Sequence, residues 1–273
     1  MNKPELITRT ITGLCIGAVS LGAIILSPWT YLAWICVITF LGTREFLHLV
    51  LHAQSDKKQL LFPFFLTIIV AATGYLCVKG ESPFIALLAL PVIISLRQLT
   101  DMFMVNDISR LAVTNQAMYS ATAYIALPAL AGCVYLLEPY DWKYVLIAVV
   151  LIWVNDIGAY LIGSSWGKHK IAPSISPGKS IEGTVGGALM TFLGGYLLFQ
   201  WIKDIPAGYV IGLSLLTPPA ALAGDLWESV LKRNAGVKDS GNLLPGHGGI
   251  LDRYDSLLFV LPIAALAYFI FVL

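Results

Sequence analysis

Residues 143–164 read KYVLIAVVLIWVNDIGAYLIGS, an apolar run in which only Lys143 and Asp156 carry a charge. The run is close to the ~20 residues that an α-helix needs to cross a bilayer. Its apolar residues are continuous and do not alternate with polar ones, which favours a helix over a barrel strand. In lipid the backbone must satisfy its own hydrogen bonds, so only helices and closed barrels can span. The run therefore predicts a transmembrane helix.

The rest of the chain has a similar composition. Its 273 residues are 58% hydrophobic and 12% charged, with a mean hydropathy of +0.79. A soluble domain would carry about 25% charged residues. The net charge of +1 gives no global field that would attract nucleic acid. We therefore predict an all-α polytopic integral membrane protein that lies in a lipid bilayer and binds no nucleic acid.

About nine transmembrane helices are expected, with the N-terminus in the cytoplasm. They are placed at 11–27, 29–43, 60–78, 83–99, 117–137, 143–164, 184–202, 207–226 and 257–273. The segment 83–99 is short and contains Pro91, which neighbouring helices can accommodate. The simplest organisation is a single membrane domain over 1–273. Within it, 1–140 would form an N-terminal helical bundle and 141–273 would carry the catalytic helices and loops.

Basic residues support this orientation. Of the 17 lysines and arginines, only Lys79, Lys143 and Lys203 fall outside, which leaves 14 on the cytoplasmic side. Such a bias is the positive-inside rule. Two predicted spans separate the loop 165–183 from the loop 227–256. Both loops should therefore open on the same cytoplasmic face.

The first polar feature is a helical stripe in AGDLWESVLKR. Asp225, Glu228, Ser229 and Lys232 stand at positions i, i+3, i+4 and i+7, so they share one helix face. The stripe could line a site, or it could be the polar side of an interfacial helix that meets water.

A glycine-rich segment follows, KDSGNLLPGHGGILDRYD at residues 238–255. Its glycines permit positive φ and close approach to a ligand, and successive N–H groups in such loops bind anions. A flexible turn is the plain alternative. Asp252 and Asp255 would face together on a helical turn, and two carboxylates near lipid need a partner such as a divalent cation.

The loop 165–183 provides a second set of polar groups. Asn155 and Asp156 lie within the preceding span, and an intramembrane Asp marks either a site or a structural hydrogen bond to another helix. SPGKSIEGT at 176–184 can present Lys179 to a phosphate. It is not a Walker motif, because position 173 is Pro where that motif has its first Gly.

Acids, bases and glycine-rich backbone together indicate metal plus phosphate, as in phosphoryl or nucleotidyl transfer. The chain has no HExxH or CxxC spacing, which argues against a zinc hydrolase. The remaining cysteines and histidines are interpreted as packing or interfacial residues. They are Cys15, Cys36, Cys77, Cys133, His48, His52 and His169.

The run SVLKRNAGVKDSGNLLPGHGGILDRYD, residues 229–255, closely resembles the C-terminal motif of phosphatidate cytidylyltransferases (CDP-diacylglycerol synthases). AGDLWES and the DxGAY…SPGKSIEG stretch also resemble this family, so the likeness covers most of 153–256. Tyr254 departs from the pattern, where an aliphatic residue is expected. Residues 1–140 carry no family signal beyond apolar spans.

The resemblance implies that CTP and phosphatidate react to CDP-diacylglycerol and pyrophosphate, with Mg²⁺ and a second cation, such as K⁺, in the same acidic cluster. Asp225 and Asp252 would ligate the metal, and Asp255 would be a third ligand or support the other two. Catalytic groups would include Lys232, Arg233, Lys238, Asp239, His247 and Arg253. Substrate-binding groups would be Asp156, Lys179, Ser180, Glu182, Ser229, Gly248 and Gly249. We also expect a homodimer in a bacterial inner membrane, with a cytoplasmic active site.

Two other functions are compatible with parts of this pattern. A CTP-dependent lipid kinase would use similar CTP contacts but move the γ-phosphate to an alcohol. An ion-coupled transporter would use Asp156 and the acidic cluster, and it would need a polar path through the outer half of the membrane. The combined KRxxxxKD and HGGxxDRxD pattern favours the cytidylyltransferase.

Overall fold

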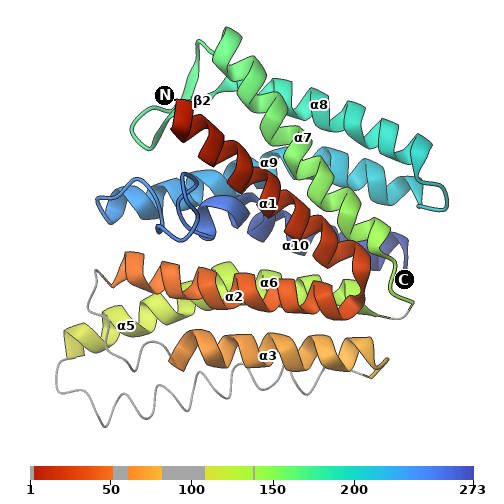
Figure 1. Cartoon of the computed structure of the whole chain (residues 1–273), viewed down its shortest axis with the longest axis horizontal. Coiled ribbons are helices and arrows are strands. Elements are labelled where there is room, and N and C mark those ends of the chain that lie inside the picture. Colours follow the sequence, from red (N-terminus) through yellow and green to blue (C-terminus); the bar gives the residue numbers. More distant parts are fainter. Residues whose placement is uncertain (1–2, 52–60, 82–107, 138) are drawn as a thin grey trace. The chain divides into compact units, whose positions relative to one another are not determined.

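The computed structural model describes residues 3–51, 61–81, 108–137 and 139–273. Within these ranges it contains eight helices that are long and apolar enough to cross a membrane (Figure 1). The predicted all-α polytopic fold is therefore confirmed. The predicted span at 83–99, like His52, lies outside the described residues, so the total of nine stays a prediction.

The chain divides into two compact units. The first unit comprises Met1–Tyr140 and Asp239–Asp252, and the second comprises Asp141–Lys238 and Arg253–Leu273. The boundary at Tyr140 coincides with the predicted end of the N-terminal bundle. The segment Asp239–Asp252, which we expected among the catalytic loops of 141–273, packs with the first unit instead.

Helices alone build the described part of the first unit's N-terminal segment. They are α1 (Lys3–Leu26), α2 (Pro28–Val50), α3 (Leu61–Val78), α5 (Ile108–Ala121), the π-helical turn η2 (Thr122–Ala126), α6 (Leu127–Gly132) and the 3₁₀ turn η3 (Cys133–Leu136). The last four run on as one span, close to the predicted 117–137.

Local chemistry explains where α2 begins and how it packs. Ser27 and Thr30 form a reciprocal capping box at its N-terminus, and Pro28 occupies the first turn, where no N–H is needed. The Tyr31 hydroxyl then donates to the Gly132 carbonyl, 3.2 Å away. Gly74 on α3 lets the Leu32 side chain approach closely, since any Cβ there would collide with it. Small residues at helix contacts have this role in membranes.

The second unit is built on long helices and one hairpin. Its elements are α7 (Trp142–Trp166), β1 (Lys170–Ala172), β2 (Ser176–Ser180), α8 (Ile181–Trp201), α9 (Ala207–Asn234) and most of α10 (Leu251–Phe271). The antiparallel hairpin pairs Lys170 with Ser180 and Ala172 with Ser176. We had expected only a loop at this position.

Glycines bring α7 and α8 into close contact. A Cβ at Gly187 would lie 2.8 Å from the Asn155 carbonyl oxygen and 2.9 Å from its Oδ1. A Cβ at Gly158 would lie 2.8 Å from the Met190 Cβ. Such short distances mean that the two backbones approach more closely than any side chain would permit. This contact fixes Asn155 on the face of α7 that meets α8, and Asp156 is the next residue along α7.

Three tyrosines join α7, α9 and α10. Tyr144 contacts Tyr209 and Tyr268 in edge-to-face geometry, with ring centroids 5.2 and 4.9 Å apart. The Tyr209 hydroxyl, fully buried, donates to the Tyr144 carbonyl at 2.9 Å. These contacts form the core of the second unit.

Replacing Tyr209 by Phe removes only the buried hydroxyl of this cluster. We expect it to lower the free energy of unfolding by about 1 kcal/mol, the usual net contribution of one hydrogen bond. Thermal unfolding in detergent micelles measures the effect. Tyr196→Phe is the matched control, because that ring on α8 is 60% exposed. Equal melting temperatures for the two variants would contradict this assignment.

Candidate active site

Asp225, near the cytoplasmic end predicted for its span, is the centre of a polar cluster in the second unit. Its Oδ2 lies 2.5 Å from the Lys179 Nζ, and its Oδ1 accepts a hydrogen bond from the Ser229 hydroxyl at 3.3 Å. Lys179 comes from β2, and the other two residues from α9. The structure therefore joins the two sequence segments that we predicted to share one site.

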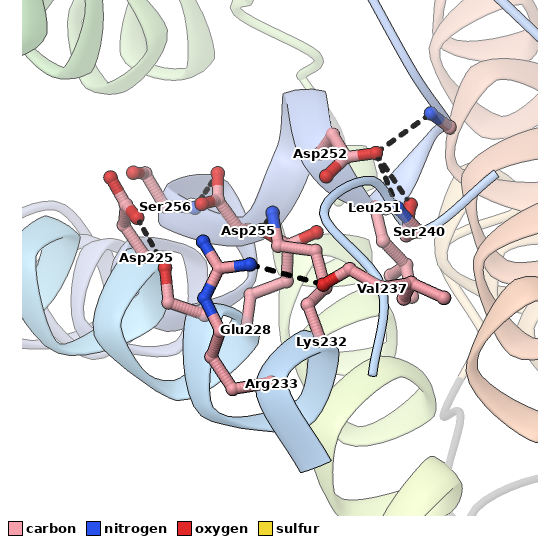
Figure 2. Close-up of polar contacts among 12 residues, drawn as sticks. Asp225, Glu228, Lys232, Arg233, Val237, Ser240, Leu251, Asp252, Asp255 and Ser256 are labelled. Atoms are coloured by element: carbon pink, nitrogen blue, oxygen red, sulfur yellow. Dashed lines mark hydrogen bonds and ion pairs between the residues drawn. The ribbon is translucent and has the colours of Figure 1, made fainter. Parts of the chain in front are cut away.

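Helix α10 brings a second carboxylate to this cluster. Gly224 on α9 lies against the backbone of Asp255, and a Cβ at Gly224 would be 2.5 Å from the Asp255 carbonyl oxygen. The Ser256 hydroxyl donates to the Ala221 carbonyl at 3.4 Å. The Asp255 carboxylate accepts from the Ser256 N–H at 2.7 Å (Figure 2). The glycine of AGDLWES thus permits the close helix contact that places Asp255 beside Asp225.

Asp156 completes an acidic set in the second unit. Its carboxylate accepts a hydrogen bond from the Asn155 amide at 3.2 Å. It interacts electrostatically with Asp225 and Asp255, and also with Lys179 and Arg253. Three carboxylates and the cations Lys179 and Arg253 that interact with them have the mixed charge that a metal–phosphate site requires.

Lys232 lies about two helical turns from Asp225 on α9 and is paired with a buried acid. Its Nζ is 2.7 Å from Glu228 Oε2, and the Glu228 side chain is 1% exposed (Figure 2). Lys232 also interacts electrostatically with Asp255. The helical stripe of the sequence is therefore a buried ion pair and not simply a face that meets water. The phosphate role of Lys232 stays a prediction.

Arg233 contacts backbone groups on both sides of its helix end. Its Nε donates to the Ile175 carbonyl at 3.2 Å, and its Nη1 donates to the Val237 carbonyl at 3.1 Å. Ile175 belongs to the turn of the hairpin, so Arg233 ties this turn to the end of α9. Lys238, a few residues on, is exposed.

Glu182 and Ser180 fix the base of the hairpin. The Glu182 carboxylate accepts from the backbone N–H groups of Lys168 and His169, each at 3.2 Å, and lies 2.6 Å from the His169 Nδ1. The Ser180 hydroxyl caps α8 by accepting from the Gly183 N–H at 3.1 Å. These contacts position Lys179 on β2. His169, interpreted from sequence as a bystander, takes part in them.

A second polar cluster lies in the first unit, on the glycine loop, by which we mean residues 239–250. The Asp252 Oδ2 accepts hydrogen bonds from the Ser240 N–H at 2.8 Å, the Ser240 hydroxyl at 2.9 Å and the Gly249 N–H at 2.8 Å (Figure 2). This carboxylate therefore organises the loop that precedes it. The metal role expected for Asp252 stays a prediction.

The centre of the glycine loop is a tight turn. The Leu244 N–H donates to the Gly248 carbonyl at 2.8 Å, and the His247 N–H donates to the Leu244 carbonyl at 2.9 Å. Gly246 and Gly248 have φ of +73° and +80°, which favour glycine. His247 packs against α1, 3.5 Å from where a Cβ of Gly13 would lie. Asp239 lies beside Gly248, since a Cβ added to Gly248 would be 3.2 Å from the Cβ of Asp239.

Glu45, on α2, is a residue of this cluster that the sequence analysis missed. Its Oε1 accepts from the Ile250 N–H at 2.9 Å, and its Oε2 accepts from the Leu251 N–H at 2.9 Å and the Ser240 hydroxyl at 3.1 Å. The predicted second span ends at residue 43 and leaves Glu45 outside it, whereas α2 continues to Val50. The apolar residues that continue after Glu45, FLHLV, were the available signal for an acid within a membrane helix.

The donor set for a metal consists of carboxylates. Among the residues that the structure describes, no group of three or more His, Cys, Asp or Glu is close enough to hold a metal ion by itself. Mg²⁺ commonly takes one or two carboxylates and completes its shell with water and substrate phosphates. Asp225 and Asp255, adjacent in the second unit, fit that mode of binding.

Comparison with known proteins relates most of the chain to a single family. Residues 7–271 match the model of the Cytidylyltransferase family. A phosphatidate cytidylyltransferase from Bacillus subtilis (strain 168) is 47% identical over 128 residues, which is 46% of this chain and 47% of the relative. One from Staphylococcus aureus (strain COL) is 46% identical over 121 residues, 44% of this chain and 46% of the relative.

A third relative, the phosphatidate cytidylyltransferase of Haemophilus influenzae (strain ATCC 51907 / DSM 11121 / KW20 / Rd), is 41% identical over 139 residues. That match covers 48% of each chain. The chain therefore spans about half the length of the relatives that it matches.

Proposed function

Because this chain belongs to the cytidylyltransferase family, we propose that it transfers the cytidylyl group of CTP to phosphatidate, giving CDP-diacylglycerol and pyrophosphate. The names of its relatives support the choice of substrates. The observation that carries the proposal is the 2.5 Å contact between Lys179 and Asp225. It places a cation suited to phosphate beside an acid suited to a metal, from the two segments that carry the family resemblance.

The reaction depends on neutralising phosphate charge more than on proton transfer. A phosphate oxygen of phosphatidate attacks the α-phosphorus of CTP, and a new P–O bond forms there. The bond from the α-phosphorus to the oxygen that bridges to the β-phosphorus breaks, and pyrophosphate leaves with that electron pair. The attacking oxygen is already anionic, so no strong general base is required. The barrier lies in bringing two polyanions together and stabilising the leaving group.

The chain's own residues divide into two roles in this proposal. Lys179 and Arg253 have positions beside the acidic set from which they would bind phosphate oxygens. Lys232 would add a third cation from within its pair with Glu228. Arg233, Lys238 and His247 are the further phosphate-binding groups that the resemblance implies.

The carboxylates are proposed as ligands for Mg²⁺. Asp225 and Asp255 would hold it in the second unit, and Asp252 is the further ligand implied by the resemblance. When bound, Mg²⁺ would neutralise phosphate charge and favour departure of pyrophosphate. A second cation, such as K⁺, is also part of the proposal.

Location follows from the two substrates. Phosphatidate resides in the bilayer and CTP in the cytoplasm, so a site at the cytoplasmic interface lets each arrive from its own phase. We propose a bacterial inner membrane, since the relatives named above are bacterial. We also propose a cytoplasmic N-terminus, from the distribution of basic residues, and a homodimer.

The test uses purified full-length protein in detergent micelles with Mg²⁺, cytidine-labelled CTP and one of two lipids. With phosphatidate, cytidine label should move into the lipid extract in proportion to pyrophosphate released. With diacylglycerol, which lacks the attacking phosphate, no label should move. A chain that consumes CTP only with diacylglycerol would be a lipid kinase. A chain that consumes no CTP with either lipid would favour the ion-coupled transporter over both enzymes.

A further inference from the structure

We propose that Glu45 is a positioning residue for this transfer reaction, which fixes the glycine loop and the first turn of α10 and thereby orients Asp252. The inference rests on the proposed function. All of the groups involved belong to the first unit. No sequence motif marks Glu45, and its role is inferred from its contacts.

Glu45 accepts hydrogen bonds from backbone groups at the start of α10. The first N–H groups of any helix have no partner within the helix. Here the Ile250 and Leu251 N–H groups donate to the two Glu45 carboxylate oxygens, each at 2.9 Å. A carboxylate at this end also interacts favourably with the helix dipole. Helix α2 therefore holds Ile250 and Leu251, where the glycine loop leads into α10, by two charge-assisted hydrogen bonds.

The glycines of the loop fit around this carboxylate. A Cβ at Gly241 would lie 2.9 Å from the Glu45 Oε1. A Cβ at Gly249 would collide with the Glu45 Oε2 and the Ser240 hydroxyl. Two glycines that the sequence analysis read as a possible cradle for phosphate thus have another role. They let the loop backbone approach an acid from a distant helix.

Ser240 links Glu45 to Asp252. Ser240 is only 4% exposed. Its hydroxyl oxygen lies 3.1 Å from the Glu45 Oε2 and 2.9 Å from the Asp252 Oδ2. Its backbone N–H also donates to Asp252. The two carboxylates, one on α2 and one on α10, therefore share the hydroxyl hydrogen of the same serine. Displacing Glu45 releases the start of α10 and one side of Ser240, so the orientation of Asp252 is no longer fixed.

The experiment compares kcat and KM for wild type, Glu45→Gln and Ser240→Ala, normalised to folded protein by size-exclusion chromatography. Gln keeps the size of Glu but turns one acceptor into an N–H donor that opposes a backbone N–H. We expect kcat to fall about 10- to 100-fold, as when groups that orient a metal ligand are removed. KM for CTP should stay within about threefold, because a group that acts on the transition state lowers kcat.

Glu81→Gln is the matched control, because it removes the same charge from an exposed position in the same unit. It should leave both constants unchanged. The double variant Glu45→Gln/Ser240→Ala should be no slower than Glu45→Gln alone, since both changes break one network.

Two results would overturn the inference. One is a Glu45→Gln protein whose kcat per folded molecule stays within about twofold of wild type, because so small a change gives a role in orientation no support. If that variant does not fold, Ser240→Ala keeps both backbone contacts of Glu45 and decides instead. The second contradicting result is an unchanged kcat for Ser240→Ala. A wild-type chain that makes no CDP-lipid refutes the proposed function itself, which separates the two failures.

Discussion

Replacing Asp225 by Asn is expected to lower cytidylyl transfer by at least about 100-fold, the usual loss when one preorganised charge in an active site is removed. Asn keeps the shape of Asp and can still accept from the Ser229 hydroxyl. It loses the charge that faces Lys179 and that would bind a cation. Turnover with labelled CTP measures the effect, and a near-normal rate would contradict the assignment.

Two companion variants separate chemistry from folding. Asp204→Asn makes the same change in the second unit at a residue with φ of +68°, a conformation that Asn tolerates well, and it should stay fully active. The exchange Lys179→Asp/Asp225→Lys keeps the ion pair but reverses it. Both side chains are partly exposed, so stability should change little. Turnover of this double variant should remain lost. Recovered turnover would show that the ion pair is needed but the position of each charge is not.

Replacing Gly187 by Val is the second change with a large expected effect. A Cβ at Gly187 lies 2.8 Å from a backbone oxygen of α7, which cannot move aside as a flexible side chain could. Overpacking usually costs 1–3 kcal/mol, and here we expect about 3 kcal/mol or more. The melting temperature in detergent micelles should fall sharply. Activity should fall with it, because Asn155 contacts both Gly187 and Asp156.

Gly22→Val is the control for this variant. Gly22 is also helical, and no atom outside its own helix lies within 4 Å of where its Cβ would be. Both variants introduce the same branched side chain into an apolar helix. Equal melting temperatures would show that α7 and α8 do not pack as described.

The helices were predictable because a membrane helix must be apolar along most of its length. Their ends were less so. Helix α9 continues eight residues past the predicted end at 226, to Asn234, because the buried Glu228–Lys232 pair stabilises polar turns that hydropathy assigns to a loop. The hairpin was missed because its strands are short and Pro173 and Pro177 interrupt any alternation of apolar residues.

The site was predictable where its residues share a segment with the family motif. Lys179, Asp225 and Ser229 were all named from sequence, and both Lys179 and Ser229 contact Asp225. Glu45 was not named, because its partners lie about 200 residues away and are mostly backbone N–H groups. Backbone donors leave no trace in side-chain identity, so only the folded chain shows them.

The measurement that tests the proposed function most directly follows the α- and γ-phosphates of CTP in parallel reactions with phosphatidate. In one reaction the α-phosphate carries the label, and in the other the γ-phosphate does. We predict that the α label enters the lipid extract and that the γ label stays in water as pyrophosphate. The reverse pattern, γ label in lipid and α label in CDP, would identify a kinase and contradict cytidylyl transfer.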